Sequence, residues 1–348
     1  MPDTQRVLSQ FADQTQACED LGSPFTAMVC RVLATRLDTR TRFGKRILEW
    51  DGDPYPDNVA LRACGAMHAL ARLGQEPRLT AAYPPNAADE ASLWSAIAAA
   101  LPRNDDFLTD FLSSPPQTNE VARSALILGG MLHLGAITRL PFDLLEIGAS
   151  AGLNQAFDEY AYDLGEGRAW GSPAAPLTIP CRWRGPVPPL EAPIAIAARA
   201  GCDLRPIDPA NGEDRLRLTS YVWADQTHRI VRLEAALAHA AARGRTVDGA
   251  DAADWVEQKL AAPRQPGTTR VLFHTIVWDY VSAPVRARII AARDRAAASA
   301  TSEAPFAHLT VESDEVRGGA AIRLAVWPGG ADRFLGRGDF HGRWAEWA

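Results

Sequence analysis

The stretch LLEIGASAGLN at Leu144–Asn154 decides the fold of this chain. It overlaps the apolar run Phe142–Ile147, which has the composition of a buried strand. Small residues at 148–152 then form a tight turn, and Leu153–Tyr160 is compatible with a helix. Glu146 lies at the strand end, two residues before the first glycine. A strand, a small-residue turn and a helix N-terminus together form the place where α/β folds bind ligands.

The residues alone leave four interpretations of this turn open. S-adenosylmethionine (SAM) carries a cationic sulfonium and an α-ammonium group, which a carboxylate such as Glu146 favours. A dinucleotide places a pyrophosphate at the helix N-terminus, where Glu146 is unfavourable and Ser150 replaces the second glycine of the usual pattern. Gly148–Gly152 also matches the nucleophile elbow G-x-S-x-G of hydrolases. The fourth interpretation is a plain strand–helix turn without a ligand.

Length and composition are those of an ordinary soluble globular protein. The 348 residues suffice for two domains, and the net charge of −6 with scattered arginines argues against nucleic acid as the main partner. Five widely spaced cysteines without a C-x-x-C motif predict buried, reduced thiols and no metal site. The N-terminus has no apolar signal core and no run suggests a membrane span, which predicts a cytoplasmic protein without a membrane partner.

The first third of the chain has helical patterns and no convincing strand before position 141. Asn58 is positioned to cap one of these helices. The spacing of apolar residues, together with the glycines and prolines that interrupt it, predicts helices over residues 4–20, 25–37, 43–50, 58–73 and 93–112. Ser113–Pro116 has the composition of a hinge. We therefore predict an all-helical N-terminal domain or cap over residues 1–116.

Residues 117–348 predict a doubly wound α/β sheet with a mixed edge. A helix capped by Thr118 or Asn119 precedes the first strand, and a mainly helical segment is expected at 216–243. A Gly-, Pro- and Trp-rich insertion at about 163–192 is expected to contain a short hairpin around residues 177–183. Later strands are expected to end at or just before Asp203, Asp251 and His274, followed by strands over 306–311, 320–327 and 338–347.

Polar residues at two of these strand ends are candidate cofactor contacts. Asp203 lies at the end of a predicted strand, the position from which a carboxylate typically binds a ribose diol in this kind of fold. Asp251 and Ala252 follow the third strand and are suited to an adenine amino group. Ordinary turn and helix capping is the competing explanation for both aspartates.

The segment HTIVWDY at 274–280 follows the clearest buried strand. His274, Trp278 and Tyr280 are expected to face the same crevice as Glu146. His274 is the candidate general base, with Tyr280 as a second catalytic candidate. A histidine that is simply hydrogen-bonded at a strand end explains His274 equally well.

Two polar clusters are candidates for the wall of an acceptor pocket. The first is QTNE at 117–120, with Gln117, Asn119 and Glu120, for which helix capping is the simpler explanation. The second is SYVWADQ at 220–226, with Tyr221, Trp223 and Asp225. Aromatic residues at this spacing belong more often to a core than to a site, but the neighbouring Asp and Gln favour a pocket rim.

The chain as a whole resembles a bacterial family classed as domain of unknown function 2332, whose members look like class I SAM-dependent methyltransferases with a helical N-terminal extension. The motifs that carry the resemblance are QTNE (117–120), LLEIGASAGLN (144–154), GCDLRPID (201–208), SYVWADQ (220–226), DAADW (251–255), HTIVWDY (274–280) and WPGG (327–330). The resemblance implies a Rossmann-like sheet and SAM as the cofactor. It names no acceptor.

The main hypothesis is therefore a SAM-dependent methyltransferase that acts on a small molecule. The turn with Glu146 and Asn154 is expected to hold the methionine part of SAM, and methyl transfer then depends mainly on in-line positioning. One alternative is a serine hydrolase that uses Ser150, with Asp279 and either His308 or His341 as partners. The helical upstream chain offers that enzyme no oxyanion loop. The other alternative is a non-catalytic protein that binds a nucleoside-like ligand or a partner in the same crevice.

Overall fold

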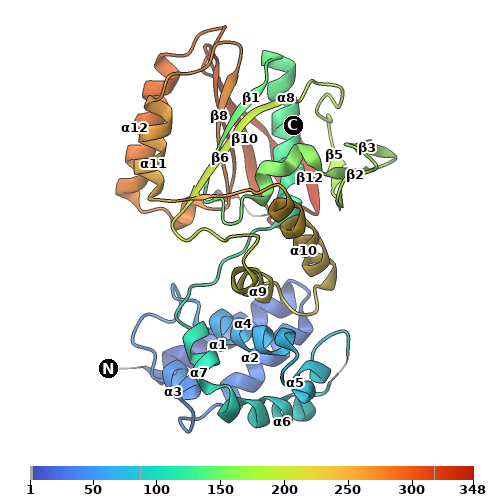
Figure 1. The fold of residues 1–348 in the computed structure, drawn as a ribbon, viewed down its shortest axis with the longest axis vertical. Coiled ribbons are helices and arrows are strands. Elements are labelled where there is room, and N and C mark those ends of the chain that lie inside the picture. Colours follow the sequence, from blue (N-terminus) through green and yellow to red (C-terminus); the bar gives the residue numbers. More distant parts are fainter. Residues whose placement is uncertain (1–2, 87, 317) are drawn as a thin grey trace. The chain divides into compact units, whose positions relative to one another are not determined.

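The computed structural model describes residues 3–86, 88–316 and 318–348. It contains two compact units (Figure 1): a helical unit, Met1–Thr118 with Gly212–Glu234, and an α/β unit, Asn119–Asn211 with Ala235–Ala348. The mixed α/β class with a helical N-terminal region is confirmed. Residues 212–234, which the sequence analysis assigned to the second domain, belong to the helical unit.

The helical unit packs its helices around one apolar core that includes Phe11, Leu33 and Met67. Its elements are α1 (Thr4–Asp20), α2 (Pro24–Arg36), α3 (Arg42–Leu48), α4 (Val59–Leu73), α5 (Pro77–Ala82), α6 (Glu90–Ala100), η1 (Leu101–Arg103), α7 (Asp105–Phe111), α9 (Gly212–Ser220) and the first half of α10 (Thr227–Ala242). Asn58 is the N-cap residue of α4, as predicted, but it has φ 52° and its side chain makes no capping hydrogen bond.

The α/β unit contains one large mixed sheet and one small sheet. Its strands are β1 (Phe142–Ile147), β2 (Ala161–Gly165), β3 (Arg168–Trp170), β4 (Thr178–Pro180), β5 (Arg182–Arg184), β6 (Ile196–Asp203), β7 (Asp248–Gly249), β8 (Thr269–Thr275), β9 (Phe306–Glu312), β10 (Ala320–Trp327), β11 (Asp332–Gly338) and β12 (Trp344–Trp347). Its helical elements are η2 (Val121–Arg123), α8 (Ser124–Thr138), η3 (Leu153–Glu159), α11 (Ala252–Ala261), η4 (Trp278–Tyr280), α12 (Ala283–Ala298) and the second half of α10.

The large sheet has the order β5-β12-β11-β10-β9-β8-β1-β6-β7. Strands β7, β6, β1, β8 and β9 are mutually parallel, whereas β10, β11 and β12 continue as an antiparallel meander. The mixed edge is thus confirmed. Since the chain runs from β1 outward to β6 and β7 on one side and to β8 and β9 on the other, the order reverses between β1 and β8.

Helices cover both faces of this sheet (Figure 1). One face packs on α11 and α12 through Leu272 and Ile289, and the other packs on α8, where Leu309 lies directly against Gly130. Side chains alternate between the faces along each strand. Glu146 is in register with Phe273, one residue before His274. Glu146 therefore points to the α8 face and His274 to the α11–α12 face, so they do not share one side of the sheet.

Several local predictions differ from the structure. Leu153–Glu159 is a 3₁₀ element with a kink at Ala156 instead of a regular helix. No hairpin forms at 177–183, because β4 pairs with β2 in the small sheet and β5 pairs with β12 in the large one. The predicted helix at 216–243 is divided into α9 and α10 by the segment 221–226. The predicted last strand at 338–347 corresponds to β12 and the final residue of β11, and the rest of β11 was not predicted.

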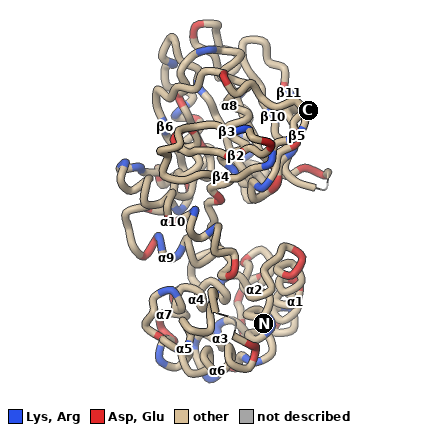
Figure 2. Tube along the Cα trace, turned by 90° about the vertical axis from the view of Figure 1, so that its right-hand side faces the viewer, with Lys and Arg blue, Asp and Glu red and all other residues tan. Residues whose placement is uncertain are grey.

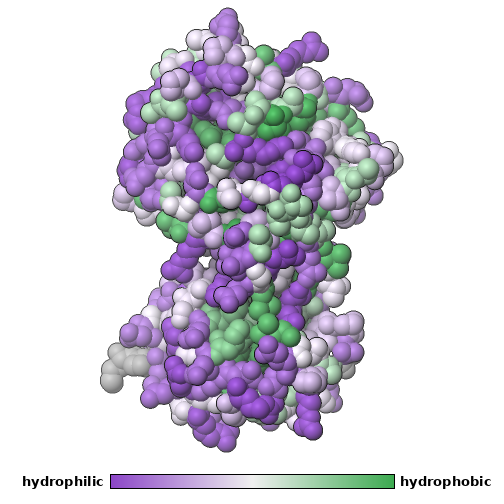
Figure 3. Space-filling view, in the orientation of Figure 1, coloured by the Kyte–Doolittle hydropathy of each residue, from purple (hydrophilic) through white to green (hydrophobic). Residues whose placement is uncertain are grey.

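The segment Val121–Thr138, mostly α8, is long and apolar enough to cross a membrane by length and composition, contrary to the sequence expectation. It is 78% buried inside the protein, as the core helix of a globular domain is. All five cysteines are free and buried, as predicted. Acidic and basic residues alternate along both units (Figure 2), and the face drawn in Figure 3 is mainly hydrophilic with small apolar areas.

Candidate functional site

The turn after β1 has its backbone fixed from several sides. Gly148, Ser150 and Gly152 have φ of 67°, 55° and 70°, which is costly for the serine. A Cβ on Gly148 would lie 2.5 Å from Val277 Cγ2, so glycine is required there for space as well as for conformation. The left-handed Ser150 persists because the surrounding hydrogen bonds determine the turn.

Every backbone amide from 149 to 153 already donates a hydrogen bond within the protein. Ala149 N donates to Cys202 O (3.0 Å), and Gly152 N to Ala149 O (2.7 Å). Ser150 N donates to Asp203 Oδ2 (2.9 Å). The remaining two, Ala151 N and Leu153 N, donate to Asn119 Oδ1 at 3.3 and 3.2 Å. Because these amides are occupied, the turn does not present the free N–H groups that bind a pyrophosphate.

Asn119 therefore has a different role from the predicted one. It does not cap its own helix but caps η3, more than thirty residues along the chain. Glu120 is the residue that caps η2, and its carboxylate accepts from Ala122 N (3.1 Å). The sequence offered both residues as candidates for an acceptor pocket, and in the structure Asn119 contacts the backbone of the turn after β1.

Glu146 is buried at the end of β1, with 2% of its surface exposed. Burial raises its pKa from 4.5 to about 8, and the charge of Asp203 adds to the rise. The Gln155 amide and the Arg123 guanidinium act in the opposite direction. A carboxyl group with this pKa is poised between its two charge states near neutrality, and a bound cation would ionise it.

Four buried polar side-chain atoms at the turn make no hydrogen bond of good geometry among the described residues, although the Gln155 amide lies near enough to Glu146 to lower its pKa. They are two acceptors, Glu146 Oε2 and Asn154 Oδ1, one donor, Gln155 Nε2, and the Ser150 hydroxyl. All four side chains are at least 95% buried. Buried polar atoms are nearly always paired, so a cluster of exceptions within ten residues indicates a missing ligand or ordered water.

Two of the residues around Glu146 are absent from the sequence predictions. Gln155 lies over Gly201, the register partner of Glu146, because a Cβ on Gly201 would be 2.3 Å from Gln155 Nε2. Arg123 donates to the carbonyl and hydroxyl oxygens of Thr275 at 2.7 and 3.0 Å. Its signal in the sequence was an arginine at the start of an otherwise apolar helix.

Asp203 and Asp251 both have the structural contacts that the sequence offered as alternatives. Asp203 accepts hydrogen bonds from Ser150 N and, at 2.9 Å, from Arg205 N. Burial raises the pKa of Asp203 above its usual value, although these two bonds act to lower it. Asp251 Oδ1 caps α11 by accepting from Ala253 N and Asp254 N. Ala252 is the first residue of that helix. Asp203 is the last residue of β6, and Asp251 follows β7. Both therefore lie at the carboxyl ends of neighbouring parallel strands, as the turn after β1 does.

His274 is engaged at both ring nitrogens. Nδ1 lies 2.6 Å from Glu312 Oε1, Nε2 lies 3.2 Å from His308 Nε2, and the ring stacks on Trp278. Burial lowers the pKa of His308 well below 6.5, aided by His274. Tyr280, the second catalytic candidate, is 80% exposed. Direct proton abstraction by His274 would require one of its present partners to move.

Four predicted pocket residues, Gln117, Tyr221, Trp223 and Asp225, belong to the helical unit. Tyr221 lies in its core: its hydroxyl donates to Ser114 O (3.1 Å), and burial raises its pKa to about 12. Trp223 is half-buried. Asp225 caps the N-terminus of α2 by accepting from Phe25 N (2.9 Å) and from the Ser23 hydroxyl.

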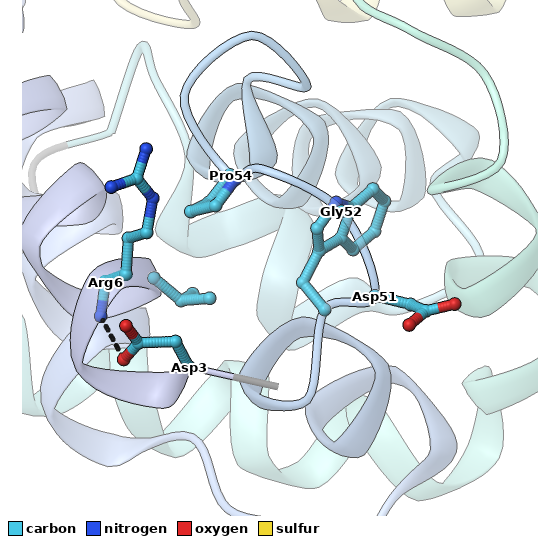
Figure 4. Close-up of a pocket in the computed structure, with 7 residues that line it drawn as sticks. Asp3, Arg6, Asp51, Gly52 and Pro54 are labelled. Carbon is cyan, nitrogen blue, oxygen red and sulfur yellow. Dashed lines mark hydrogen bonds between the residues drawn. The ribbon is translucent and has the colours of Figure 1, made fainter. Parts of the chain in front are cut away.

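A separate pocket lies in the helical unit beside the N-terminus of α1 (Figure 4). Its lining includes Arg6, which pairs with Asp53, and none of the predicted site residues. Within residues 3–86, 88–316 and 318–348, no group of three or more His, Cys, Asp or Glu side chains is arranged to hold a metal ion.

The sequence profile of a family described as "Uncharacterized protein conserved in bacteria (DUF2332)" matches residues 8–347. This match covers nearly the whole chain and agrees with the resemblance of its motifs. Comparison with curated proteins and with solved structures gave no match.

Proposed function

The chain belongs to the bacterial family DUF2332, and from the geometry of its turn we propose that it is a SAM-dependent methyltransferase with a small-molecule acceptor. The observation that carries the proposal is the cluster of unpaired, buried polar atoms at Glu146, Ser150, Asn154 and Gln155. The cluster lies where the strand order reverses, the point at which doubly wound sheets bind ligands.

The chemistry of these atoms suits the amino-acid end of SAM. Glu146 Oε2 and Asn154 Oδ1 are acceptors for an α-ammonium group, whereas Gln155 Nε2 and the Ser150 hydroxyl are donors for a carboxylate. The positive charge of Arg123 nearby favours that carboxylate. A ligand that carries both charges side by side would pair all four atoms.

The same contacts disfavour the other ligands. A dinucleotide needs free amides at the turn, and all five are occupied. A serine hydrolase needs a base on its nucleophile, but the Ser150 hydroxyl has no partner and His308 is bound to His274. Asp203 and Asp251 remain the proposed ribose and adenine contacts, although each also accepts backbone amides.

The cofactor would supply the transferable methyl group on its sulfonium. The protein's part is to bind the methionine end at the turn and to hold the acceptor in line. Since His274 is engaged by Glu312 and His308, we propose that it orients the segment after β8 and takes a proton only if the acceptor displaces one partner.

Calorimetric titration of the full chain with SAM, S-adenosylhomocysteine and NAD tests the proposal. We expect binding of the first two ligands, no binding of NAD, and at least a tenfold loss of affinity in Glu146→Gln, because the negative charge that pairs with the ammonium group is lost. Ionisation of Glu146 should release a proton between pH 6 and 8, visible as a dependence of the measured heat on the buffer. NAD binding, or no binding of either SAM or its product, contradicts the proposal, and labelling of Ser150 by a fluorophosphonate would favour the hydrolase.

A further inference from the structure

The segment between β8 and η4 is held in a strained conformation beside the ligand turn. Ile276 has φ 49°, in the left-handed region that a β-branched residue rarely adopts. Its amide donates to Val311 O (3.0 Å) at the end of β9. Strain of this kind persists only where the surroundings impose it, and it is concentrated at functional sites.

Glu312, the last residue of β9, supplies most of that constraint. Its two carboxylate oxygens accept from Val277 N, both at 3.2 Å, and Oε2 also accepts from Trp278 N at 3.2 Å. Oε1 lies 2.6 Å from His274 Nδ1. One partly buried carboxylate thus joins the end of β8, the first turn of η4 and the end of β9.

The constrained segment is a wall of the ligand turn. Val277 Cγ2 occupies the space that a side chain on Gly148 would need. On its other side, Thr275 accepts two hydrogen bonds from Arg123, whose charge acts on Glu146. A displacement of residues 275–277 would therefore reach both the glycine turn and the guanidinium beside Glu146.

We propose that Glu312 is a positioning residue that holds Val277 against Gly148 and so preserves the ligand geometry of the 148–152 turn. Glu312 itself does not contact the ligand in this scheme. The effect on the ligand rests on the proposed function, whereas the effect on the turn does not.

The test compares five versions of this chain: a control variant, the wild type, Glu312→Ala, Glu312→Gln and Val277→Ala. Hydrogen exchange measures the protection of residues 148–152 and 276–278 without ligand, and calorimetry measures the affinity for S-adenosylhomocysteine. Asp105→Ala is the matched control, because Asp105 is likewise partly buried and accepts two backbone amides, those of Arg42 and Phe43, but in the helical unit.

Glu312→Ala should increase exchange in both segments and weaken ligand binding by about tenfold to a hundredfold. Glu312→Gln keeps one acceptor oxygen but replaces the other with an NH2 donor, so both losses should be smaller than in Glu312→Ala without being abolished. Val277→Ala should increase exchange at 148–152 alone and weaken ligand binding. This variant tests whether Val277 holds the turn in place even if Glu312→Ala does not fold. Asp105→Ala should lower the stability of the helical unit without changing exchange at 148–152 or ligand affinity.

Unchanged exchange at 148–152 in Glu312→Ala and Val277→Ala would overturn the inference, as would equal affinities in all variants. If the wild type binds no S-adenosylhomocysteine, the proposed function fails, and the exchange measurements alone decide whether Glu312 positions the turn.

Discussion

Glu146→Gln should change how the stability of the α/β unit depends on pH. The wild-type carboxyl is buried, and its pKa rises from 4.5 to about 8 in the folded protein. The unfolded chain therefore binds fewer protons than the folded protein between these values. The stability that Glu146 contributes is fully present below pH 4.5 and is lost as the pH rises, with the loss complete above pH 8.

The magnitude follows from the pKa rise. One pKa unit corresponds to about 1.4 kcal/mol, so the rise from 4.5 to about 8 corresponds to roughly 5 kcal/mol between acidic and alkaline conditions. In the experimentally convenient range from pH 5.5 to 8.5, roughly 3 kcal/mol of the free energy of unfolding should disappear in the wild type. Glutamine has the same shape but does not titrate, so this component is absent from the variant.

Urea-dependent hydrogen exchange of peptides that cover β1, corrected for intrinsic rates at each pH, reports the free energy of unfolding of this unit. Glu191→Gln is the control, because it removes the same charge from an exposed site in the same unit. We expect the wild type and the control to lose roughly 3 kcal/mol more stability than Glu146→Gln between pH 5.5 and 8.5. Equal slopes for all three proteins would refute the argument that Glu146 is desolvated.

Three further predictions concern the rest of the fold. Gly201→Ala should destabilise the α/β unit by about 1–3 kcal/mol in chemical denaturation, since the added Cβ would lie 2.3 Å from Gln155 Nε2. Gly249→Ala is the tolerated control, because the nearest atom to its added Cβ would be 3.6 Å away. Asp225→Ala should lower the unfolding free energy of the helical unit by about 1–2 kcal/mol, because the α2 cap is lost; unchanged stability would contradict the capping role. His308 ring signals in NMR should not titrate between pH 6 and 8, because burial lowers the pKa of this histidine. The stability that His308 contributes is therefore present above pH 6.5 and is lost as the pH falls. A titration midpoint near pH 6.5 would contradict the lowered pKa.

The parallel part of the sheet and the ligand turn were accessible from the sequence because their signals are local. An apolar run, a carboxylate at its end and closely spaced glycines identify β1 and its turn without knowledge of any partner strand. The same logic located the ends of β6 and β8. Glu312 carries the same signal as Glu146, an acidic residue at the end of an apolar strand, and could have been found in this way.

Contacts between distant segments were not accessible. Asp225 caps a helix two hundred residues earlier in the chain, and this contact helps to place 212–234 in the helical unit. The predicted hairpin failed for a related reason. Only Cys181 separates β4 from β5, so the chain passes from one sheet to the other without reversing direction.

The positions of Glu146 and His274 on opposite faces depend on register. Both residues end apolar strands that lie side by side, which suggested one shared crevice. A parallel pair shifted by one residue would have put them on the same face, because side chains alternate with a period of two. The observed register places Phe273 beside Glu146, and no local pattern specifies that alignment.

The turn combines a fully satisfied backbone with unsatisfied side chains, and this contrast bears on its function. Every amide from 149 to 153 has a partner, so the chain fixes the turn without a ligand. Leaving a buried polar atom unpaired costs about 1–3 kcal/mol, and the turn leaves four. If stability alone determined these residues, apolar side chains of similar size would remove that cost. The arrangement supports the proposed function, because a preorganised site for a small zwitterionic group needs a rigid backbone that the ligand does not have to order and side-chain donors and acceptors that the ligand completes.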